Sequence, residues 1–319
     1  MRLSGIRRAL ARALWPDPTA RLEDIMRELT ALRHTVSALN YGVPAPLIPP
    51  RELMALARDK AESLCRAHVR PFYLGDHRAL STILARYNFF SDTRDIGFGT
   101  HMLTGGFWEM WLTIFIARTI KEGMFVLDVG ANFGYYTVLM ADLIGPSGKI
   151  IAFEPNPIAA ASAEASLRVN GFEARGTVMR SAVSDNAHSV AFAIPHHEPK
   201  NARIVPAGYA SAGEDVIQVP AVVIDEICRN ERKVDFIKID AEGGEYTIFQ
   251  GMQEIIRRDR PMIILEFNAV RPGADALLDL ILQTYPSLKY LGYDSSLNQV
   301  TPDRLMVESI GEDWLLLLE

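Results

Sequence analysis

The stretch Val126-Leu-Asp-Val-Gly-Ala-Asn-Phe-Gly-Tyr-Tyr136 decides the fold of this chain. It starts in an apolar run, passes Asp128, and then places Gly130 and Gly134 just before a second apolar segment. A buried strand, a glycine turn and a helix in this order are typical of folds in which parallel strands alternate with helices. Glycine lets a ligand approach the backbone closely, and the first N–H groups of the following helix suit an anionic group.

The chain from Lys121 to its C-terminus repeats this alternation of short apolar runs and helical segments. The predicted strands are Phe125–Val129, Lys149–Phe153, Val178–Val183, Val234–Ile239, Met262–Phe267, Leu288–Tyr293 and Trp314–Leu318. The predicted helices are Tyr135–Ile144, Pro157–Asn170, Glu245–Arg257 and Ala274–Tyr285. Continuous apolar strands between helices indicate an α/β fold with a mostly parallel seven-stranded sheet that helices cover on both faces. Ligands of such sheets bind at the carboxyl ends of the strands.

The second strand ends in Phe153-Glu154-Pro155, which places an acidic residue 24 positions after Gly130. A carboxylate at this strand end can accept hydrogen bonds from both hydroxyls of a ribose. The alternative role for Glu154 is a carboxylate at a helix N-terminus.

The glycine turn departs from the fingerprint of dinucleotide-binding proteins. That fingerprint requires glycine at positions 132 and 135, where this chain has Asn132 and Tyr135. A pyrophosphate therefore has poorer access to the turn, and a smaller adenosyl ligand with an amino-acid tail fits better.

The fourth strand ends in Asp240-Ala-Glu242-Gly-Gly-Glu245, which crowds three carboxylates around a glycine pair. Buried like charges are costly unless a cation, a proton or a ligand compensates them, and Lys238 or a sulfonium ion would serve. The alternative is helix capping by Asp240 or Glu242, with Glu245 in the first turn.

Glu266 and Asn268 end the fifth strand on the same side. Together with Asp240, their spacing permits a divalent metal without requiring one, so we expect no metal site.

The segment before this domain has a different pattern. Residues 51–120 are predicted to be a mainly helical cap, with helices over Arg51–Val69, Asp76–Tyr87 and Trp108–Lys121. Asp92–Gly106 is rich in glycine and charge, which is typical of a loop that lines a site.

Residues 1–50 are predicted to form a third part, a helical segment with a proline-rich linker at Val43–Pro50. Residues 2–15 read as a basic amphipathic helix that would either contact an anionic membrane surface or pack on the protein itself. Residues 22–39 place leucine, isoleucine and valine at 3-4-3-4-3 spacing, which would either form a homodimer or dock on the chain's own domain.

Composition limits the classes of partner. The net charge of −6 gives the chain no general attraction to nucleic acid. The two cysteines, Cys65 and Cys228, have no metal spacing and favour a reducing, cytoplasmic setting, with the basic helix allowing a place at the inner face of a membrane. No apolar stretch is long enough for a transmembrane helix.

Three motifs together resemble the FkbM-type methyltransferases: Val126–Thr137, Ala152-Phe-Glu-Pro-Asn-Pro157 and Ile237-Lys-Ile-Asp-Ala-Glu-Gly-Gly-Glu-Tyr246. The upstream stretches Asp92–Gly97 and Gly106–Glu109 are similar to part of that family as well. The resemblance implies a Rossmann-like class I methyltransferase fold, S-adenosylmethionine as cofactor, and O-methylation of a hydroxyl on a sugar, glycan or related metabolite.

The resemblance also implies roles for particular residues. The methionine part of the cofactor would be held by Asp128, Gly130, Asn132 and Gly134. Glu154 would hold the ribose, and Asp240 would lie near the methyl donor. A hydroxyl acceptor must lose its proton, so a base is needed. His101 is the natural neutral candidate because of its ordinary pKa. The competing carboxylates are Glu109, Asp240, Glu242 and Glu245.

Two other functions stay open on the sequence. The first is a non-catalytic scaffold that binds the cofactor within a biosynthetic assembly. The second is a nicotinamide-dependent oxidoreductase, against which Asn132 and Tyr135 argue.

Overall fold

The computed structural model describes residues 47–308 and 311–319. The predictions for residues 2–15 and 22–39 therefore lie outside the described residues. Within the described part, no helix is long and apolar enough to cross a membrane.

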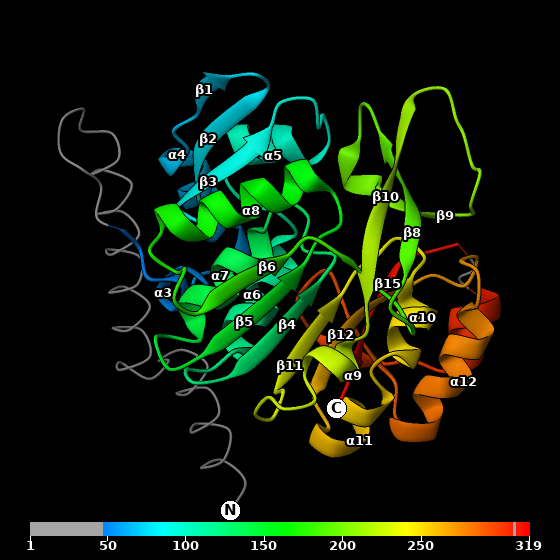
Figure 1. Ribbon diagram of the computed structural model, residues 1–319. Coiled ribbons are helices and arrows are strands. Elements are labelled where there is room, and N and C mark those ends of the chain that lie inside the picture. Colours follow the sequence, from blue (N-terminus) through cyan, green and yellow to red (C-terminus); the bar gives the residue numbers. More distant parts are fainter. Residues whose placement is uncertain (1–46, 309–310) are drawn as a thin grey trace, which may run out of the picture.

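An eight-stranded sheet forms the centre of the molecule (Figure 1). Its order is β14-β13-β15-β12-β11-β4-β5-β6. The bounds are β4 Phe125–Val129, β5 Lys149–Phe153, β6 Gly176–Met179, β11 Phe236–Ile239, β12 Met262–Phe267, β13 Lys289–Leu291, β14 Leu297–Gln299 and β15 Trp314–Leu318. The sheet has one strand more than the seven predicted from the sequence. The additional strand is β14, which is short and largely exposed and has too little apolar pattern to be predicted.

The middle of the sheet is parallel and fully buried. All five residues of β4 are buried, and β4 pairs in parallel with β5 on one side and β11 on the other. β11 pairs in parallel with β12, while β15 runs antiparallel between β12 and β13. This arrangement confirms the predicted Rossmann-like α/β fold, and it brings the carboxyl ends of β4, β5, β11 and β12 to one edge.

Helices cover both faces of this sheet (Figure 1). One buried cluster includes side chains of α6 Met110–Thr119, α7 Tyr135–Leu143 and α8 Pro157–Val169. A second cluster includes side chains of α9 Ile224–Ile227, α10 Glu245–Gln250, α11 Gln253–Asp259 and α12 Ala274–Thr284. The single helix predicted over Glu245–Arg257 is thus two helices. The chain also forms a π-helical turn over Arg304–Glu308.

The predicted helix over Asp76–Tyr87 was wrong. This region forms an antiparallel three-stranded sheet of β1 Phe72–Gly75, β2 Arg78–Ile83 and β3 Tyr87–Asp92. Asp76 and His77 have φ of 47° and 59°, which is the left-handed conformation of a two-residue hairpin turn. Exposed and buried positions then alternate along β2, as in a half-buried strand.

The other elements before β4 pack onto the large sheet. They are α3 Pro50–Leu53, α4 Arg58–His68 and α5 Phe98–Thr104. α5 lies inside the stretch predicted to be a loop over Asp92–Gly106. Residues of α3, α4, β3 and α5 share one continuous core cluster with α7 and α8, so residues 48–120 have no core of their own.

A second small sheet follows β6, with the order β7-β10-β8-β9. The strands are β7 Ala182–Val183, β8 Ser189–Pro195, β9 Arg203–Val205 and β10 Glu214–Val222, with a 3-10 turn η1 at Pro199–Asn201. The single strand predicted over Val178–Val183 is therefore split between β6 and β7. In Figure 1 this sheet stands beside the carboxyl edge of the large one.

Candidate active site

A cavity of about 580 Å³ lies at the carboxyl ends of the central strands. The turns after β4, β5 and β11 line it, and η1 and β9 of the small sheet close another side. It is of the size that small ligands and cofactors occupy.

The turn after β4 is shaped by two glycines. Gly130 has φ of +75°, and a Cβ there would lie 1.7 Å from the main-chain oxygen of Asp240. Gly134 has φ of +89°, and its Cβ would lie 2.7 Å from the Cβ of Ala163 on α8. Both positions therefore require glycine for packing within the protein, and Gly130 is also where the turns after β4 and β11 touch. Gly134 does not line the cavity, in contrast to Gly130.

Glu154 ends β5 and lines the cavity. Its carboxylate accepts hydrogen bonds from the main-chain N–H of Asn132 at 2.7 Å and of Asn156 at 2.8 Å. Burial raises the pKa of Glu154 to about 7, against the effect of these two donors. Asn156, rather than Glu154, caps α8, because its side chain accepts hydrogen bonds from the main-chain N–H of Ile158 and Ala159. Glu154 is thus fixed at the cavity wall and not used as a helix cap.

Asp128 has a different place from the one the resemblance implied. It is fully buried beneath the turn and does not line the cavity. Its carboxylate accepts a hydrogen bond from Thr137 Oγ1 at 2.6 Å, and Lys238 Nζ lies 3.9 Å away. Asp128 therefore anchors α7 to β4, whereas Gly130 and Asn132 line the cavity itself.

Lys238 is a buried cation at the floor of the site. Its Nζ lies 3.3 Å from the carboxylate of Asp240 and 5.2 Å from the ring centre of Tyr136. Burial alone would lower the pKa of Lys238, but the charges of Asp240 and Asp128 raise it on balance. Lys238 therefore stays protonated and offsets the carboxylates around it. Asp240 lines the cavity, as predicted.

Glu109 reaches the same cavity from the turn before α6. Its backbone has φ of 34°, and its carboxylate accepts a hydrogen bond from the Tyr136 hydroxyl at 2.8 Å. Burial and then the charge of Asp240 raise the pKa of Glu109 to about 6. A carboxylate with this pKa suits proton transfer near neutral pH.

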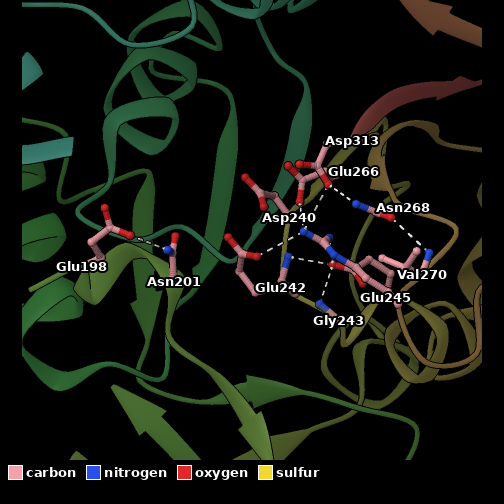
Figure 2. A network of polar contacts seen from close by, with 12 residues as sticks. Glu198, Asn201, Asp240, Glu242, Gly243, Glu245, Glu266, Asn268, Val270 and Asp313 are labelled. Carbon is pink, nitrogen blue, oxygen red and sulfur yellow. Dashed lines mark hydrogen bonds and ion pairs between the residues drawn. The ribbon is translucent and has the colours of Figure 1, made fainter. Parts of the chain in front are cut away.

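Figure 2 shows the carboxylates of Glu242, Glu245 and Glu266 gathered near the ends of β11 and β12, and Arg271 joins these three. Its guanidinium donates to Glu245 at 3.0 Å, to Glu242 at 3.1 Å and to Glu266 at 2.6 Å. Burial and the charge of Asp240 raise the pKa of Glu242 to about 7 and that of Glu266 to about 8. A role for Arg271 was not predicted from the sequence. The one indication of it in the sequence was the need for a cation beside the acids at the carboxyl edge of the sheet.

Glu245 is a structural residue in this network. It begins α10, and its carboxylate accepts hydrogen bonds from the main-chain N–H of Ala241 and Gly243, both at 3.2 Å. It does not line the cavity, in contrast to Glu242.

Three carboxylates in this region, those of Asp240, Glu242 and Glu266, have oxygens within 4.8 Å of one another. The guanidinium of Arg271 already neutralises Glu242 and Glu266. The amide oxygen of Asn268 accepts a hydrogen bond from the main-chain N–H of Val270 at 3.1 Å, and its amide nitrogen donates to Asp313 at 2.8 Å. Of the three residues whose spacing permits a metal, Asp240 and Glu266 thus lie together, with Glu242 beside them.

His101 is exposed on α5 and does not line the cavity. Its ring lies edge-on to Trp108, with 5.2 Å between the ring centres, and Trp108 does line the cavity. Of the two predicted residues from the stretch 92–109, the structure thus brings Glu109, and not His101, to the other candidate residues.

A family model described as the methyltransferase FkbM domain matches residues 128–295. Among curated proteins, the chain is 23% identical over 191 residues to methyltransferase sdnD of Sordaria araneosa, covering 50% of this chain and 73% of that protein. It is 37% identical over 86 residues to a protein-L-isoaspartate O-methyltransferase of Aeropyrum pernix, covering 27% of this chain and 32% of that protein.

Two solved structures match this chain at a lower sequence identity than these curated proteins do. A methyltransferase FkbM from Methylobacillus flagellatus KT matches at 20% identity and a TM-score of 0.41, covering 63% of this chain and 44% of that one. An O-methyltransferase from Bacillus cereus, solved in complex with SAH, matches at 16% identity and a TM-score of 0.35, covering 66% and 78%.

Proposed function

This chain belongs to the FkbM methyltransferase family, and we propose that it transfers a methyl group from S-adenosylmethionine to a hydroxyl oxygen of a sugar, glycan or related metabolite. The observation that carries the proposal is the position of Glu109. A half-buried carboxylate with a pKa of about 6 lines the same cavity as the glycine turn and Glu154.

The residues present fit S-adenosylmethionine. Gly130 and Asn132 would hold its methionine part beside the N-terminus of α7, and Glu154 would accept hydrogen bonds from the ribose hydroxyls. The apolar side chains of Phe153, Val183 and Ile248 line the cavity and would contact the adenine. Bound there, the cofactor supplies a methyl group activated by its positive sulfur.

The protein's own work is to orient the acceptor and accept its proton. Holding the acceptor oxygen in line with the methyl group removes much of the entropic cost of the reaction. Glu109 would accept the hydroxyl proton, and the hydrogen bond from Tyr136 holds its carboxylate in place. Lys238 keeps its own proton, so it acts as a fixed positive charge that offsets Asp240.

The Glu109→Gln variant tests the assignment of the base. We expect kcat to fall by about 10²–10⁴-fold, which is the usual contribution of general acid–base catalysis. The wild-type rate should also fall below about pH 6, where Glu109 becomes protonated. The exposed His101, changed to Gln as the matched control, should keep its rate. A Glu109→Gln variant with wild-type kcat would show that another group accepts the proton.

Finding the acceptor comes first. Mass spectrometry of glycans and metabolites from cells with and without the gene should reveal a species that lacks one methyl group in the deletion strain. The purified protein should then methylate that species in the presence of S-adenosylmethionine. Binding of the cofactor without any such turnover would instead indicate a non-catalytic scaffold, and binding of NAD in its place would indicate an oxidoreductase.

A further inference from the structure

A second cavity, of about 700 Å³, adjoins the first. Glu109, Glu266 and Asp313 line both cavities, so they form the boundary between the two spaces. None of the residues assigned above to the cofactor lines the second cavity. A molecule whose reactive oxygen lies at Glu109 can therefore extend into this space without displacing the cofactor.

Aromatic rings form much of the wall of the second cavity. Trp111 and Tyr293 meet edge to face with 4.9 Å between ring centres, and Tyr290 and Trp314 meet in the same way at 4.8 Å. Tyr293 is 73% exposed, although it contacts Trp111, which leaves part of its ring open to a ligand. Such rings attract cations through the negative potential of their faces.

The charged side chains that line the second cavity all have one sign, although Arg271 lies behind the wall and pairs with Glu266. Four carboxylates line it, and the described part of its lining contains no lysine, arginine or histidine; the four are Glu109, Glu266, Glu312 and Asp313. The first cavity is lined by six carboxylates but, unlike the second, also by four cations, which are Lys200, Arg203, Lys238 and Arg271. The two spaces therefore differ in the charge that they favour.

The rings of this wall already bind cations of the protein itself. Arg58 lies 5.3 Å from the ring centre of Trp111, and Arg304 lies 5.4 Å from that of Trp314. Neither arginine lines the second cavity. The rings are thus held in place by contacts outside the cavity, and their orientation does not depend on a ligand.

We propose that the second cavity binds a protonated amine carried by the acceptor at a distance from the oxygen that is methylated. The proposal rests on the proposed function and names the class of acceptor: an amine-bearing compound, not a neutral or anionic one. The ammonium group would lie against the aromatic wall and donate hydrogen bonds to the carboxylates.

Binding of such an amine would also help the reaction. Glu109 and Glu266 are half-buried near other negative charges, and this raises the pKa of both. A cation placed next to them favours their ionised forms. The bound amine would therefore keep Glu109 unprotonated and ready to accept the hydroxyl proton.

The test compares three probes of similar size and different charge: glucosamine, glucose and glucuronate. Each is titrated into the full chain at neutral pH, with intrinsic tryptophan fluorescence as the readout. We expect glucosamine to bind at least about tenfold more tightly than glucose, and glucuronate to bind least. Equal binding of all three, tighter binding of glucuronate, or no binding of glucosamine would overturn the proposal.

Two variants locate the binding. Glu312 and Tyr293 are exposed and line the second cavity but not the first, so Glu312→Gln and Tyr293→Ala should fold normally. Each should weaken glucosamine binding by about tenfold and leave glucose binding unchanged. Glu308→Gln is the matched control, because Glu308 is exposed nearby and lines neither cavity. Unchanged glucosamine affinity in both variants would remove the second cavity as the amine site.

Calorimetry with S-adenosylmethionine on the same samples separates this proposal from the proposed function. A protein that binds the cofactor but shows no preference for glucosamine would refute only the amine site. A protein that does not bind the cofactor would refute the methyltransferase proposal on which the amine site depends.

Discussion

The turns after β4 and β11 lie side by side at the carboxyl edge of the sheet and touch where Gly130 meets the main-chain oxygen of Asp240. The first turn is built from backbone. The main-chain N–H groups of Gly130 and Ala131 both donate to the carbonyl of Phe153 at 3.1 Å. The second turn is built from charged side chains, with Arg271 joining three carboxylates.

The first turn therefore offers a ligand a defined backbone shape, whereas the second offers it charged groups. A backbone turn with glycines has no titratable side chain of its own, and it suits a ligand that main-chain groups bind. A turn made of carboxylates on a single arginine has an electrostatic balance that one proton or one ligand can shift. The second turn is therefore the region that will respond to the acceptor and to pH.

Breaking the charged turn should have the largest effect on stability. In Arg271→Met, three carboxylates lose the cation that neutralises them, and removing one partner of a buried ion pair costs about 3–5 kcal/mol. Urea denaturation should show this loss. Arg257→Met, which removes an exposed arginine on α11, should change stability little. A loss no larger than that of the control would mean that Arg271 does not hold the second turn.

Breaking the contact between the turns should cost somewhat less. Alanine at Gly130 needs an unfavourable positive φ and must displace the Asp240 carbonyl, and we expect a loss of roughly 3 kcal/mol. Gly171 is the matched control, since its φ is +74° but no atom lies within 4 Å of its added Cβ. Gly171→Ala should cost only about 1–2 kcal/mol. Equal losses in thermal unfolding would refute the close contact.

A smaller effect should appear as a pH dependence of stability. The folded-state pKa values of Glu242, about 7, and Glu266, about 8, exceed the ordinary value of 4.5. The folded protein therefore holds more protons than the unfolded chain between those values, and the free energy of unfolding falls as pH rises from about 5 to 8. Glu266→Gln should flatten this slope, and the exposed Glu52→Gln should not. Stability that rises over this range would contradict the assignment.

The backbone turn could be predicted from the sequence almost completely. Strands β4, β5, β12 and β15 have the predicted bounds, because continuous apolar runs between turn residues leave little choice of structure. The place of Glu154 at the cavity could be predicted as well, because the end of a parallel strand lies at the edge of the sheet where ligands bind. These features depend on local pattern, and local pattern is what a sequence displays.

The charged turn could be predicted only in part. The acids Asp240, Glu242 and Glu266 were visible, but Arg271 comes from a loop after β12, and only the folded chain brings its guanidinium to them. The same limit explains the roles of His101 and Asp128, which depend on whether a side chain points toward the cavity or into the core. Leu80, Leu84 and Tyr87 have helical spacing, so the hairpin before α5 was mistaken for a helix.

The most direct test of the account is the affinity of S-adenosylmethionine for the wild-type protein and for Glu154→Gln, measured by calorimetry at pH 8. The carboxylate of Glu154 already accepts two main-chain hydrogen bonds and would accept those of the ribose, which a glutamine cannot do with both of its terminal atoms. We predict that the wild-type protein binds the cofactor and that the variant binds it about 10–100-fold more weakly. Glu164→Gln, at a half-buried position of α8 that does not line the cavity, should bind as the wild type does. No binding by the wild-type protein, or equal binding by Glu154→Gln, would contradict the account.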